Sequence, residues 1–294
     1  MTVVALDVGG TSMKGALIAP DGTALHTEDR PTPRPPEAAA AAVVAFAADL
    51  AARADGVTAA GIAVPGLVDE ATGTAVYSAN IGWRDVPFGA LVSERLGVPV
   101  ALGHDVRTGG LGEAARGAGR GAGDFLFLPI GTGIAAALVL GGAPYPGASG
   151  WSGEIGHTVV RPGGEPCTCG NRGCLEAYAS AAGVSRRHAA LTGADVPAEE
   201  VVRRALAGDG PAARVWDEAL DALADSLATA TLMLDPALVV VGGGLAKAGD
   251  ALLGPLAERF AARLLFRAPP PVVPALLGDR AAVHGAAVLA ASAR

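Results

Sequence analysis

Cysteine, histidine and aromatic side chains are all scarce in this sequence, and so is positive charge. The 294 residues include three cysteines and five histidines, and aromatic residues make up 4% of a chain that is 51% hydrophobic. Alanine therefore supplies much of the apolar content. Lys and Arg number 22 against 29 Asp and Glu, which gives a net charge of −7. A chain this acidic lacks the basic face that a nucleic-acid-binding surface normally needs, although backbone N–H groups can still bind a small anion locally.

Long hydrophobic runs are also missing. The N-terminal stretch MTVVALDVGG has no basic region, and Asp7 interrupts its apolar residues, so it does not resemble a signal peptide. The run AAAAAVVAFAA at 38–48 is shorter than the roughly 18 apolar residues that a membrane helix needs. The uncharged segment 125–153 is longer, but it is rich in glycine and proline and is interpreted as two buried strands and a loop. We therefore expect a cytoplasmic protein with reduced thiols that contacts no membrane.

The hydrophobic pattern predicts a mixed α/β fold. Three short strands at 2–8, 13–19 and 22–28 are joined by turns and indicate an antiparallel meander. Strands at 125–133 and 134–140 repeat this arrangement in a weaker form, which indicates two related lobes with a cleft between them. The other expected elements are strands at 57–66 and 98–105, a strand leading through a triple glycine into a helix start at 236–246, and helices near 37–54, 88–97, 106–117, 174–191, 197–207, 211–234 and 280–293.

All three cysteines lie in one short loop beside a histidine. The spacing is His157-x9-Cys167-x-Cys169-x4-Cys174. Three thiolates and one imidazole form a closed tetrahedral zinc shell, which leaves no position for an activated water. The predicted zinc is therefore structural rather than catalytic. A cluster of reduced thiols, or a disulfide with one thiol left over, is the alternative.

Two carboxylates flank this loop. Glu154 precedes His157 by three residues, and Glu176 follows Cys174 by two. A metal would hold both carboxylates rigidly, and rigid carboxylates are good acceptors for sugar hydroxyls. His157 would have two tasks if one ring nitrogen bound the metal and the other donated to a hydroxyl. The loop is thus a candidate sugar-binding element as well as a candidate metal site.

Three glycine clusters follow apolar strands and are candidate phosphate-binding loops. The first is GGT at 9–11, which comes after Asp7 and before Lys14. The second is GTG at 131–133, and the third lies in VGGGLA at 241–246. Glycines let backbone N–H groups approach a phosphate closely. The first cluster is not a Walker A motif, and a plain tight turn explains any single cluster, but three together indicate a nucleotide.

An aspartate follows the strand at 98–105 and is a candidate general base. Asp105 comes directly after His104, where one lobe is expected to meet the other. A sugar hydroxyl is a poor nucleophile, and a carboxylate within hydrogen-bond reach can accept its proton as the oxygen attacks phosphorus. The local alternative is that Asp105 only caps the helix at 106–117.

Taken together, these residues resemble the ROK family (repressors, open reading frames and sugar kinases). The resemblance runs nearly end to end and rests on DVGGT (7–11), VPG (64–66), NIGW (80–83), HD (104–105), LGE (111–113), GTG (131–133), GEIGH (153–157), CTCGNRGCLE (167–176) and VGGG (241–244). It implies the α/β, two-lobed actin/hexokinase-like (ribonuclease H-like) ATPase fold, with an interlobe cleft that binds ATP and Mg²⁺. We assign 1–106 plus 281–294 to the smaller N-terminal lobe and 107–280 to the larger lobe that carries the zinc loop.

The same resemblance assigns a role to individual residues. Asp105 would be the catalytic base on the sugar 6-hydroxyl, and Asp7 would help to order Mg²⁺ through water. The sugar-binding set would be Gly66, Asn80, His104, Asp105, Glu154, His157 and Glu176. The nucleotide-binding set would be Asp7, Gly9, Gly10, Thr11, Lys14, Gly131, Thr132 and Gly133 around the phosphates, with Gly243 and Gly244 near the adenosine. The structural Zn²⁺ would be held by His157, Cys167, Cys169 and Cys174, and a homodimer is expected.

The chain departs from the family pattern at two places. The family usually has NDAN around the base, where the first Asn bonds a sugar hydroxyl, but this chain reads HDVR and has His104 there. A histidine has a different reach and a pH-dependent charge, so the sugar preference is the property most affected. The second glycine loop continues with Ile134 and three alanines instead of glycines. The added methyl groups would either crowd the nucleotide or pack as a strand.

The resemblance implies a kinase that phosphorylates the 6-hydroxyl of a hexose. Glucose and N-acetylglucosamine are the leading acceptors, followed by N-acetylmannosamine. The main alternative is a non-catalytic sugar sensor that has kept the fold, because His104 replaces a sugar-binding residue. A repressor is disfavoured, since Asp7 lies within the first strand and leaves no room for a preceding helix-turn-helix, and the acidic charge disfavours DNA.

Overall fold

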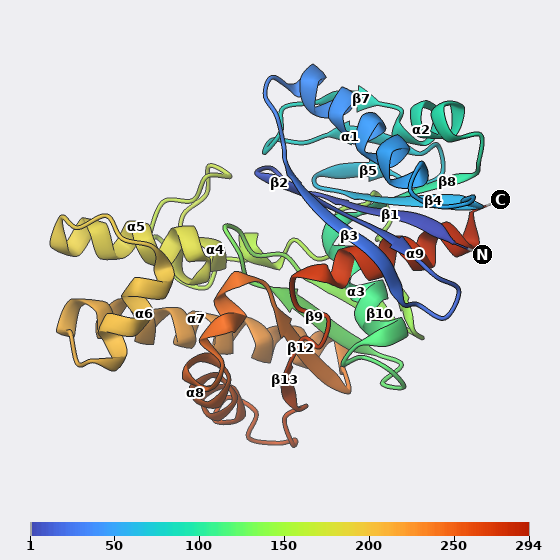
Figure 1. Cartoon of the computed structure of the whole chain (residues 1–294). Helices are drawn as coiled ribbons and strands as arrows, with labels where there is room; N and C mark the ends of the chain where they lie inside the picture. The colour runs from blue at the N-terminus through green and yellow to red at the C-terminus, as the bar shows by residue number, and fades with distance from the viewer. Residues whose placement is uncertain (1, 294) are drawn as a thin grey trace. The chain divides into compact units, whose positions relative to one another are not determined.

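The computed structural model describes residues 2–293. The chain divides into two units. Figure 1 shows its helices and strands, coloured from blue at the N-terminus to red at the C-terminus. The first unit runs to Gly121, takes in the short segment Gly142–Ser152 and is completed by the C-terminal segment from Arg280. The second comprises Ala122–Gly141 and Gly153–Asp279. This division differs from the predicted boundaries because helix α3 (Asp105–Arg116) packs against the C-terminal helix α9 (Ala281–Ser292), which keeps α3 in the first unit.

The first unit is built on a five-stranded mixed sheet. Its strands lie in the order β3-β2-β1-β4-β8. The first three form the predicted antiparallel meander, while β4 and β8 run parallel to β1. The strands are β1 (Val3–Val8), β2 (Ser12–Ile18), β3 (Ala24–Pro31), β4 (Ala59–Val64) and β8 (Val100–His104).

Alternation of side chains along β1 sends apolar residues to both faces of this sheet. Val4 and Leu6 pack in a cluster that includes Phe46 of α1 (Pro36–Ala51), together with residues of α2 (Phe88–Leu96). On the other face, Val3 and Ala5 pack with the small apolar residues of α9. Both faces of the sheet are therefore covered by helices.

Glycine allows α3 and α9 to approach each other closely. A Cβ added at Gly112 would lie 2.2 Å from the carbonyl oxygen of Ala281, and one at Gly285 would lie 1.7 Å from that of Thr108. Both distances are far below van der Waals contact. Glycines weaken the prediction of a helix at 106–117, yet the structure requires one of them where α3 meets α9.

A small antiparallel sheet lies between β4 and α2 in the sequence of the first unit. It consists of β5 (Leu67–Asp69), β6 (Thr74–Tyr77) and β7 (Arg84–Val86), paired in that order. The hydrophobic pattern does not predict these strands, which are only three or four residues long.

The second unit contains a sheet in which β10, β9, β12 and β13 lie in this order. The predicted hairpin of β9 and β10 is present, and β12 runs parallel to both β9 and β13. The strands are β9 (Phe125–Pro129), β10 (Ala137–Leu140), β12 (Leu238–Gly242) and β13 (Val272–Pro274). A two-residue strand, β11 (Ala143–Pro144), belongs to the segment 142–152 of the first unit.

The helices of the second unit share one apolar core with its sheet, in which Leu126 and Leu128 of β9 pack with Trp216 and Leu223. These helices are α4 (Leu175–Ala179), α5 (Ala181–Thr192), α6 (Ala198–Leu206), α7 (Gly210–Leu234) and α8 (Asp250–Ala261). Single 3₁₀ turns are η1 (Ile155–His157), η2 (Gly244–Ala248) and η3 (Gly278–Arg280).

Two predictions for these helices were wrong in detail. The single helix expected at 174–191 is two helices, because Ser180 has an extended backbone and its side chain accepts the N–H of Gly183 to cap α5. The helix start expected after the triple glycine is only the 3₁₀ turn η2, and α8 begins at Asp250.

No helix in the described part of the chain combines the length and the apolarity needed to cross a bilayer.

Candidate active site and metal centre

The candidate residues of the first unit gather at one edge of its main sheet. Because β1, β4 and β8 are parallel, their carboxyl ends meet at the same edge. Asp7 lies near the end of β1 and pairs with Ala63, while His104 ends β8 beside Val64. Asp7, Gly66 and Asp105 therefore belong to loops and ends that share this edge.

The first glycine loop is a pinned turn between β1 and β2. The Gly9 N–H donates to the Ser12 carbonyl at 2.9 Å, and the Thr32 hydroxyl donates to the Gly9 carbonyl at 2.6 Å. Thr11 is exposed at the tip of the turn. Lys14 follows on β2, where it pairs in register with Asp7. The turn thus presents a hydroxyl to solvent, with a lysine and a carboxylate in neighbouring strands.

Gly66 and Asn80 also lie beside this edge. Gly66 has a φ of 96°, and a Cβ there would be 2.1 Å from the Tyr77 carbonyl oxygen, so only glycine fits. Asn80 is exposed in the turn that follows β6. A Cβ at Gly10 would lie 3.5 Å from the Asn80 Cβ, which places Asn80 against the first glycine loop.

Asp105 is the first residue of α3, and the residue before it, His104, is the N-cap of this helix. His104 has an extended backbone, and its Nδ1 accepts the N–H of Arg107 at 3.5 Å. The local alternative, in which Asp105 caps the helix, is therefore wrong, since His104 fills that position. The Asp105 Oδ1 accepts the N–H of Val106 at 2.7 Å and lies 3.4 Å from His104 Nε2.

Burial raises the pKa of Asp105 to about 6, although the N–H of Val106 and the charge of Arg107 act in the opposite direction. The side chain is 29% exposed, so it remains open to a substrate. A carboxyl group with a pKa close to neutrality is suited to accept a proton and release it again.

Sequence reasoning missed a buried arginine close to Asp105. The Arg107 side chain is 4% exposed and donates from Nη2 to Glu70 Oε1 at 2.9 Å and from Nη1 to the Gly150 carbonyl at 3.0 Å. These residues line a cavity of about 350 Å³, together with Leu67, Val76 and Ser149 among others. Glu70 and Gly150 lie 37 and 43 residues from Arg107, so no local pattern reveals the contact.

In the second unit, two of the glycine clusters are neighbours. Ile130 joins them, because its N–H donates to the Gly242 carbonyl and its carbonyl accepts the N–H of Leu245. A Cβ at Gly243 would lie 2.5 Å from the Ile130 nitrogen, and Gly243 has a φ of 79°. The exposed stretch Thr132–Gly133 and the exposed Gly244 therefore lie on adjoining loops.

Glu176 supports the second glycine loop. Its Oε2 accepts the N–H of Ile134 at 3.0 Å, and a Cβ at Gly133 would lie 2.6 Å from the same oxygen. The N–H of Ala181 also donates to the Gly131 carbonyl. Ile134, Ala136 and Ala137 are buried, so these side chains that replace glycine pack into the interior. The strand predicted at 134–140 begins only at Ala137, the first residue of β10.

Glu154 and His157 approach the same loop from the segment that precedes the cysteines. Gly153 and Gly156 allow this, because a Cβ at either would lie about 2 Å from the carbonyl oxygen of Ala136 or Ile134. Glu154 Oε2 and His157 Nε2 are 3.9 Å apart, and both side chains are partly exposed. The second unit thus holds Glu154, His157 and Glu176 around one loop.

The four predicted zinc ligands lie together in the second unit. The ligand atoms of His157, Cys167, Cys169 and Cys174 are all within 4.8 Å of one another. Cys167 Sγ is 3.7 Å from His157 Nδ1, and Cys169 Sγ is 3.8 Å from Cys174 Sγ. A tetrahedral zinc with bonds of about 2.3 Å to sulfur separates its ligand atoms by about 3.6–3.8 Å, so the residues fit the ion.

The surroundings of these thiols also fit a cation. Burial raises the pKa of Cys174 to about 12, so its thiol stays protonated unless a positive charge lies beside it. The backbone N–H of Asn171 lowers the pKa of the exposed Cys169. All three cysteines are free of disulfides. The loop is closed by isolated antiparallel β-bridges, one between Val159 and Cys174 and one between Pro166 and Arg172.

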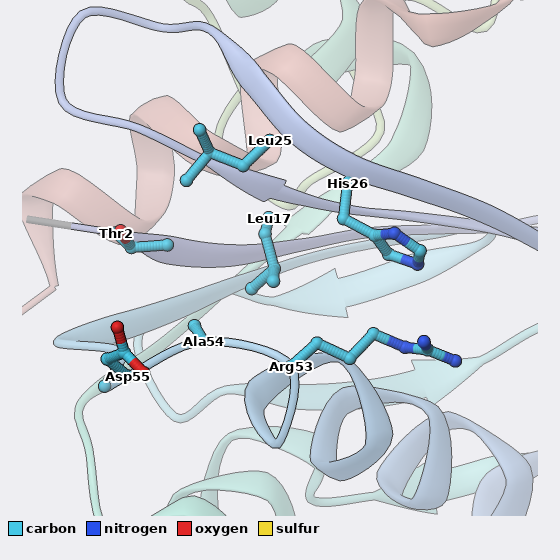
Figure 2. Close-up of a pocket in the computed structure, with 8 residues that line it drawn as sticks. Thr2, Leu17, Leu25, His26, Arg53, Ala54 and Asp55 are labelled. Atoms are coloured by element: carbon cyan, nitrogen blue, oxygen red, sulfur yellow. The ribbon is translucent and has the colours of Figure 1, made fainter.

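A larger cavity of about 470 Å³ lies elsewhere in the first unit (Figure 2). It is lined by Thr2 and Leu17, by Leu25 and His26 of β3, and by the residues after α1, with Arg53 and Asp55 at its lower side in the view. These residues lie where β1 begins and β2 ends, at the opposite edge of the sheet from Asp7 and His104. None of the predicted site residues lines this cavity.

Comparison with known proteins matches nearly the whole chain to one family. The chain matches the ROK family over residues 3–293. It is 34% identical to a glucokinase of Halalkalibacterium halodurans over 291 residues, which cover 90% of this chain and 86% of the relative. A ROK hexokinase from Thermus thermophilus superposes with a TM-score of 0.89 at 33% identity, covering 99% of each chain.

A second solved structure is a ROK family glucokinase from Streptomyces griseus in complex with glucose and AMPPNP. It superposes with a TM-score of 0.87 at 30% identity and covers 99% of this chain and 100% of that one. The predicted α/β, two-lobed actin/hexokinase-like fold class is therefore confirmed. Matched over nearly its whole length, the chain belongs to the ROK family.

Proposed function

We propose that the protein is an ATP-dependent kinase that transfers the γ-phosphoryl group to the 6-hydroxyl of a hexose, with glucose as the first acceptor to test. The observation that carries the proposal is Asp105, a partly exposed carboxylate with a pKa raised to about 6 at the carboxyl edge of the main sheet. The relatives named glucokinase support a sugar phosphotransferase.

In the proposed reaction, the Asp105 carboxylate accepts the proton of the sugar 6-hydroxyl. The sugar oxygen forms a bond to the γ-phosphorus as the bond from that phosphorus to the β,γ-bridging oxygen breaks, and ADP leaves with the bond's electron pair. General base catalysis of this kind contributes roughly 10²–10⁴-fold in rate. Most of the remaining acceleration comes from alignment and from charge neutralisation.

The nucleotide phosphates are assigned to the glycine loops. Gly9, Gly10 and Thr11 with Lys14 serve in the first unit, and Gly131, Thr132 and Gly133 in the second, with Gly243 and Gly244 toward the adenosine. Backbone N–H groups in such turns are ready-made donors to phosphate oxygens. Mg²⁺, when bound with ATP, supplies charge neutralisation at the phosphates, and Asp7 is the residue proposed to order it through water.

The sugar is assigned to polar groups from both units. Gly66, Asn80 and His104 contribute from the first, and Glu154, His157 and Glu176 from the second. One oxygen of Glu176 already accepts the Ile134 N–H, so its other oxygen is proposed for the sugar. We assign a structural Zn²⁺ to His157, Cys167, Cys169 and Cys174, where it would hold His157 and the chain beside Glu176 in place.

A coupled assay of ADP release over a panel of hexoses and N-acetylhexosamines tests the function. We expect turnover with glucose or N-acetylglucosamine, and we expect Asp105→Asn to lose at least about 100-fold of it. Turnover that survives in Asp105→Asn would remove the base assignment. Sugar binding by calorimetry without turnover on any acceptor would instead favour the non-catalytic sensor.

A second variant tests which residue sets the acceptor. His104→Asn restores the residue usual in the family, and we expect it to change the ratio of kcat/KM between glucose and the N-acetylhexosamines. An unchanged ratio would mean that His104 acts on α3 as a cap and does not select the sugar.

A further inference from the structure

Arg107 links three separate segments of the first unit. It is the last residue of HDVR, at a position where the ROK pattern has Asn. Its guanidinium reaches Glu70, which follows β5, and the Gly150 carbonyl in the segment 142–152, while its backbone N–H donates to His104. A guanidinium is costly to bury unless it is paired, and an asparagine at this position could not reach as far or carry charge.

We propose that Arg107 is a positioning residue for the reaction, which ties the start of α3, with Asp105, to the β5–β6 turn through Glu70 and to the segment 142–152 through Gly150. The inference rests on the proposed function, in which Asp105 is the base. Arg107 does not touch the substrate in this proposal; it acts through Asp105 and His104.

Position 107 acts on Asp105 in two ways, of which the second belongs to the arginine side chain. First, the backbone N–H, which any residue except proline would supply, donates to His104 Nδ1, so a neutral His104 carries its proton on Nε2, which lies 3.4 Å from Asp105 Oδ1. Second, the positive charge of Arg107 favours the Asp105 carboxylate and opposes the effect of burial. The backbone contact orients His104 beside the carboxylate, and the guanidinium charge favours the basic form of Asp105.

Among the described residues, Arg107 is the charged group that shifts the pKa of Asp105, although Asp7 of β1 lies at the same edge of the sheet. Glu70 is the partner of Arg107, and its negative charge partly offsets the guanidinium. α9, which packs along α3, brings His284, and the charges that act on His284 are Arg116, Arg280 and Glu113. Glu113 and Arg116 lie two turns or more along α3 from Asp105. His104, at the end of β8, lies beside the carboxylate.

The test measures the Asp105 pKa directly and through the reaction. The carboxyl carbon of Asp105 is followed by NMR in protein with labelled aspartate, and its signal is identified by its absence in Asp105→Asn. The pH dependence of kcat/KM is recorded for the same variants. We expect Arg107→Met to raise both the carboxyl pKa and the acid limb of the rate profile by about one unit, which is about a tenfold loss of kcat/KM on that limb.

Three further variants make the result specific. Arg107→Lys keeps the charge and should restore the pKa while it lowers kcat, because an ammonium cannot make the two directed contacts. Glu70→Gln leaves the guanidinium uncompensated and should move both values to lower pH, which tests the proposal even if Arg107→Met unfolds. Arg95→Met, at an exposed residue of α2, is the control and should change neither value.

The outcomes separate this inference from the proposed function. If the carboxyl pKa moves as expected but the rate profile does not follow, Arg107 acts on Asp105 and the base assignment fails. If a folded Arg107→Met and Glu70→Gln leave the carboxyl pKa where it is in the wild type, the inference is overturned whatever the activity.

Discussion

The surroundings of Asp105 distinguish a helix cap from a candidate general base. Its local sequence, a carboxylate directly after an apolar strand, is equally typical of a helix cap. The structure gives the cap to His104 and leaves Asp105 partly exposed with a raised pKa. The hydrogen bond of His104 to the Arg107 N–H decides between the two interpretations, and burial then raises the pKa of Asp105. The position of this residue could be predicted, but its protonation behaviour could not.

The first prediction concerns the pH dependence of the reaction. A general base must be deprotonated in the free enzyme, so kcat/KM should rise with pH, bend at an apparent pKa of about 6, and level off above about pH 7. Initial rates at low sugar concentration across this range measure it. A profile without a bend in the range of about pH 5 to 7 would contradict the assignment.

The second prediction concerns stability. The pKa of Asp105 is higher in the folded protein than its ordinary value of 3.8, so the folded state prefers the protonated form, and ionisation costs stability as pH rises from about 4 to above 6. Asp105→Asn removes this cost. Its free energy of unfolding relative to wild type should therefore increase by about 1–2 kcal/mol between about pH 4.5 and 7.5, a figure already reduced for partial exposure.

Urea unfolding at the two pH values measures this change. If the free energy of unfolding differs between variant and wild type by the same amount at both pH values, burial does not raise the pKa of Asp105. A gain in stability together with a loss of activity is the pattern expected of a functional residue.

Helix α3 has a low helix propensity in the sequence, yet it packs closely against α9 in the structure. Helix propensity counts Gly109, Gly110 and Gly112 as unfavourable, at about 1 kcal/mol each relative to alanine. Propensity describes an isolated helix and has no information on α9, which lies more than 150 residues later in the chain. The existence of the helix could be predicted from its pattern, but the purpose of its glycines could not.

The third prediction tests this contact between helices. Gly285→Ala places a Cβ 1.7 Å from the Thr108 carbonyl oxygen, so α3 and α9 must separate. We expect a loss of at least about 2–3 kcal/mol in the free energy of unfolding. Gly254→Ala in α8 is the control, because beyond its chain neighbours and the backbone of its own helix nothing lies within 4 Å of the added Cβ. Pro255 follows it and offsets the gain in helix propensity, so we expect a change of less than about 1 kcal/mol. Equal effects in the two variants would contradict the close contact.

The cysteine loop is an element that the sequence predicted well, because the ligands lie within 18 residues of one another. Chain connectivity alone brings such residues near, and the structure places their four ligand atoms within 4.8 Å of one another. The contacts of Glu176 and Ile134 were not predicted, since the partners are 42 residues apart. Short sequence separation is thus the property that distinguishes the predictable part of this site.

The fourth prediction is that the purified protein contains one zinc per chain, measured by elemental analysis. Removal by a strong chelator should lower the thermal stability and weaken sugar binding, and added Zn²⁺ should restore both. Cys174→Ser should contain less than half of the metal. A metal-free protein with unchanged sugar affinity would show that the loop is held by its hydrogen bonds alone.

At the scale of the whole molecule, the hydrophobic pattern predicted the α/β class and the two hairpins. The resemblance to the family predicted the two-lobed actin/hexokinase-like fold. The division into units was harder to predict. The chain passes between them four times, at 121/122, 141/142, 152/153 and 279/280. A boundary of this kind depends on packing between distant segments, and no local change in composition marks it.

The fifth prediction is that the protein is a homodimer, as the resemblance implies. Light scattering on native protein should give twice the chain mass of 28.9 kDa. The measurement should be repeated over a tenfold range of concentration, because a stable dimer keeps its mass on dilution. A mass of one chain at all concentrations would contradict the prediction.

The place of α9 in the first unit has a consequence for biosynthesis. This helix covers one face of the sheet that the first strands begin, yet the ribosome makes it after every residue of the second unit. During translation, the second unit can complete its fold while the early sheet still lacks its last helix. The apolar side chains of Val3, Ala5 and Ile18 then stay exposed to chaperones until α9 itself has emerged from the ribosome.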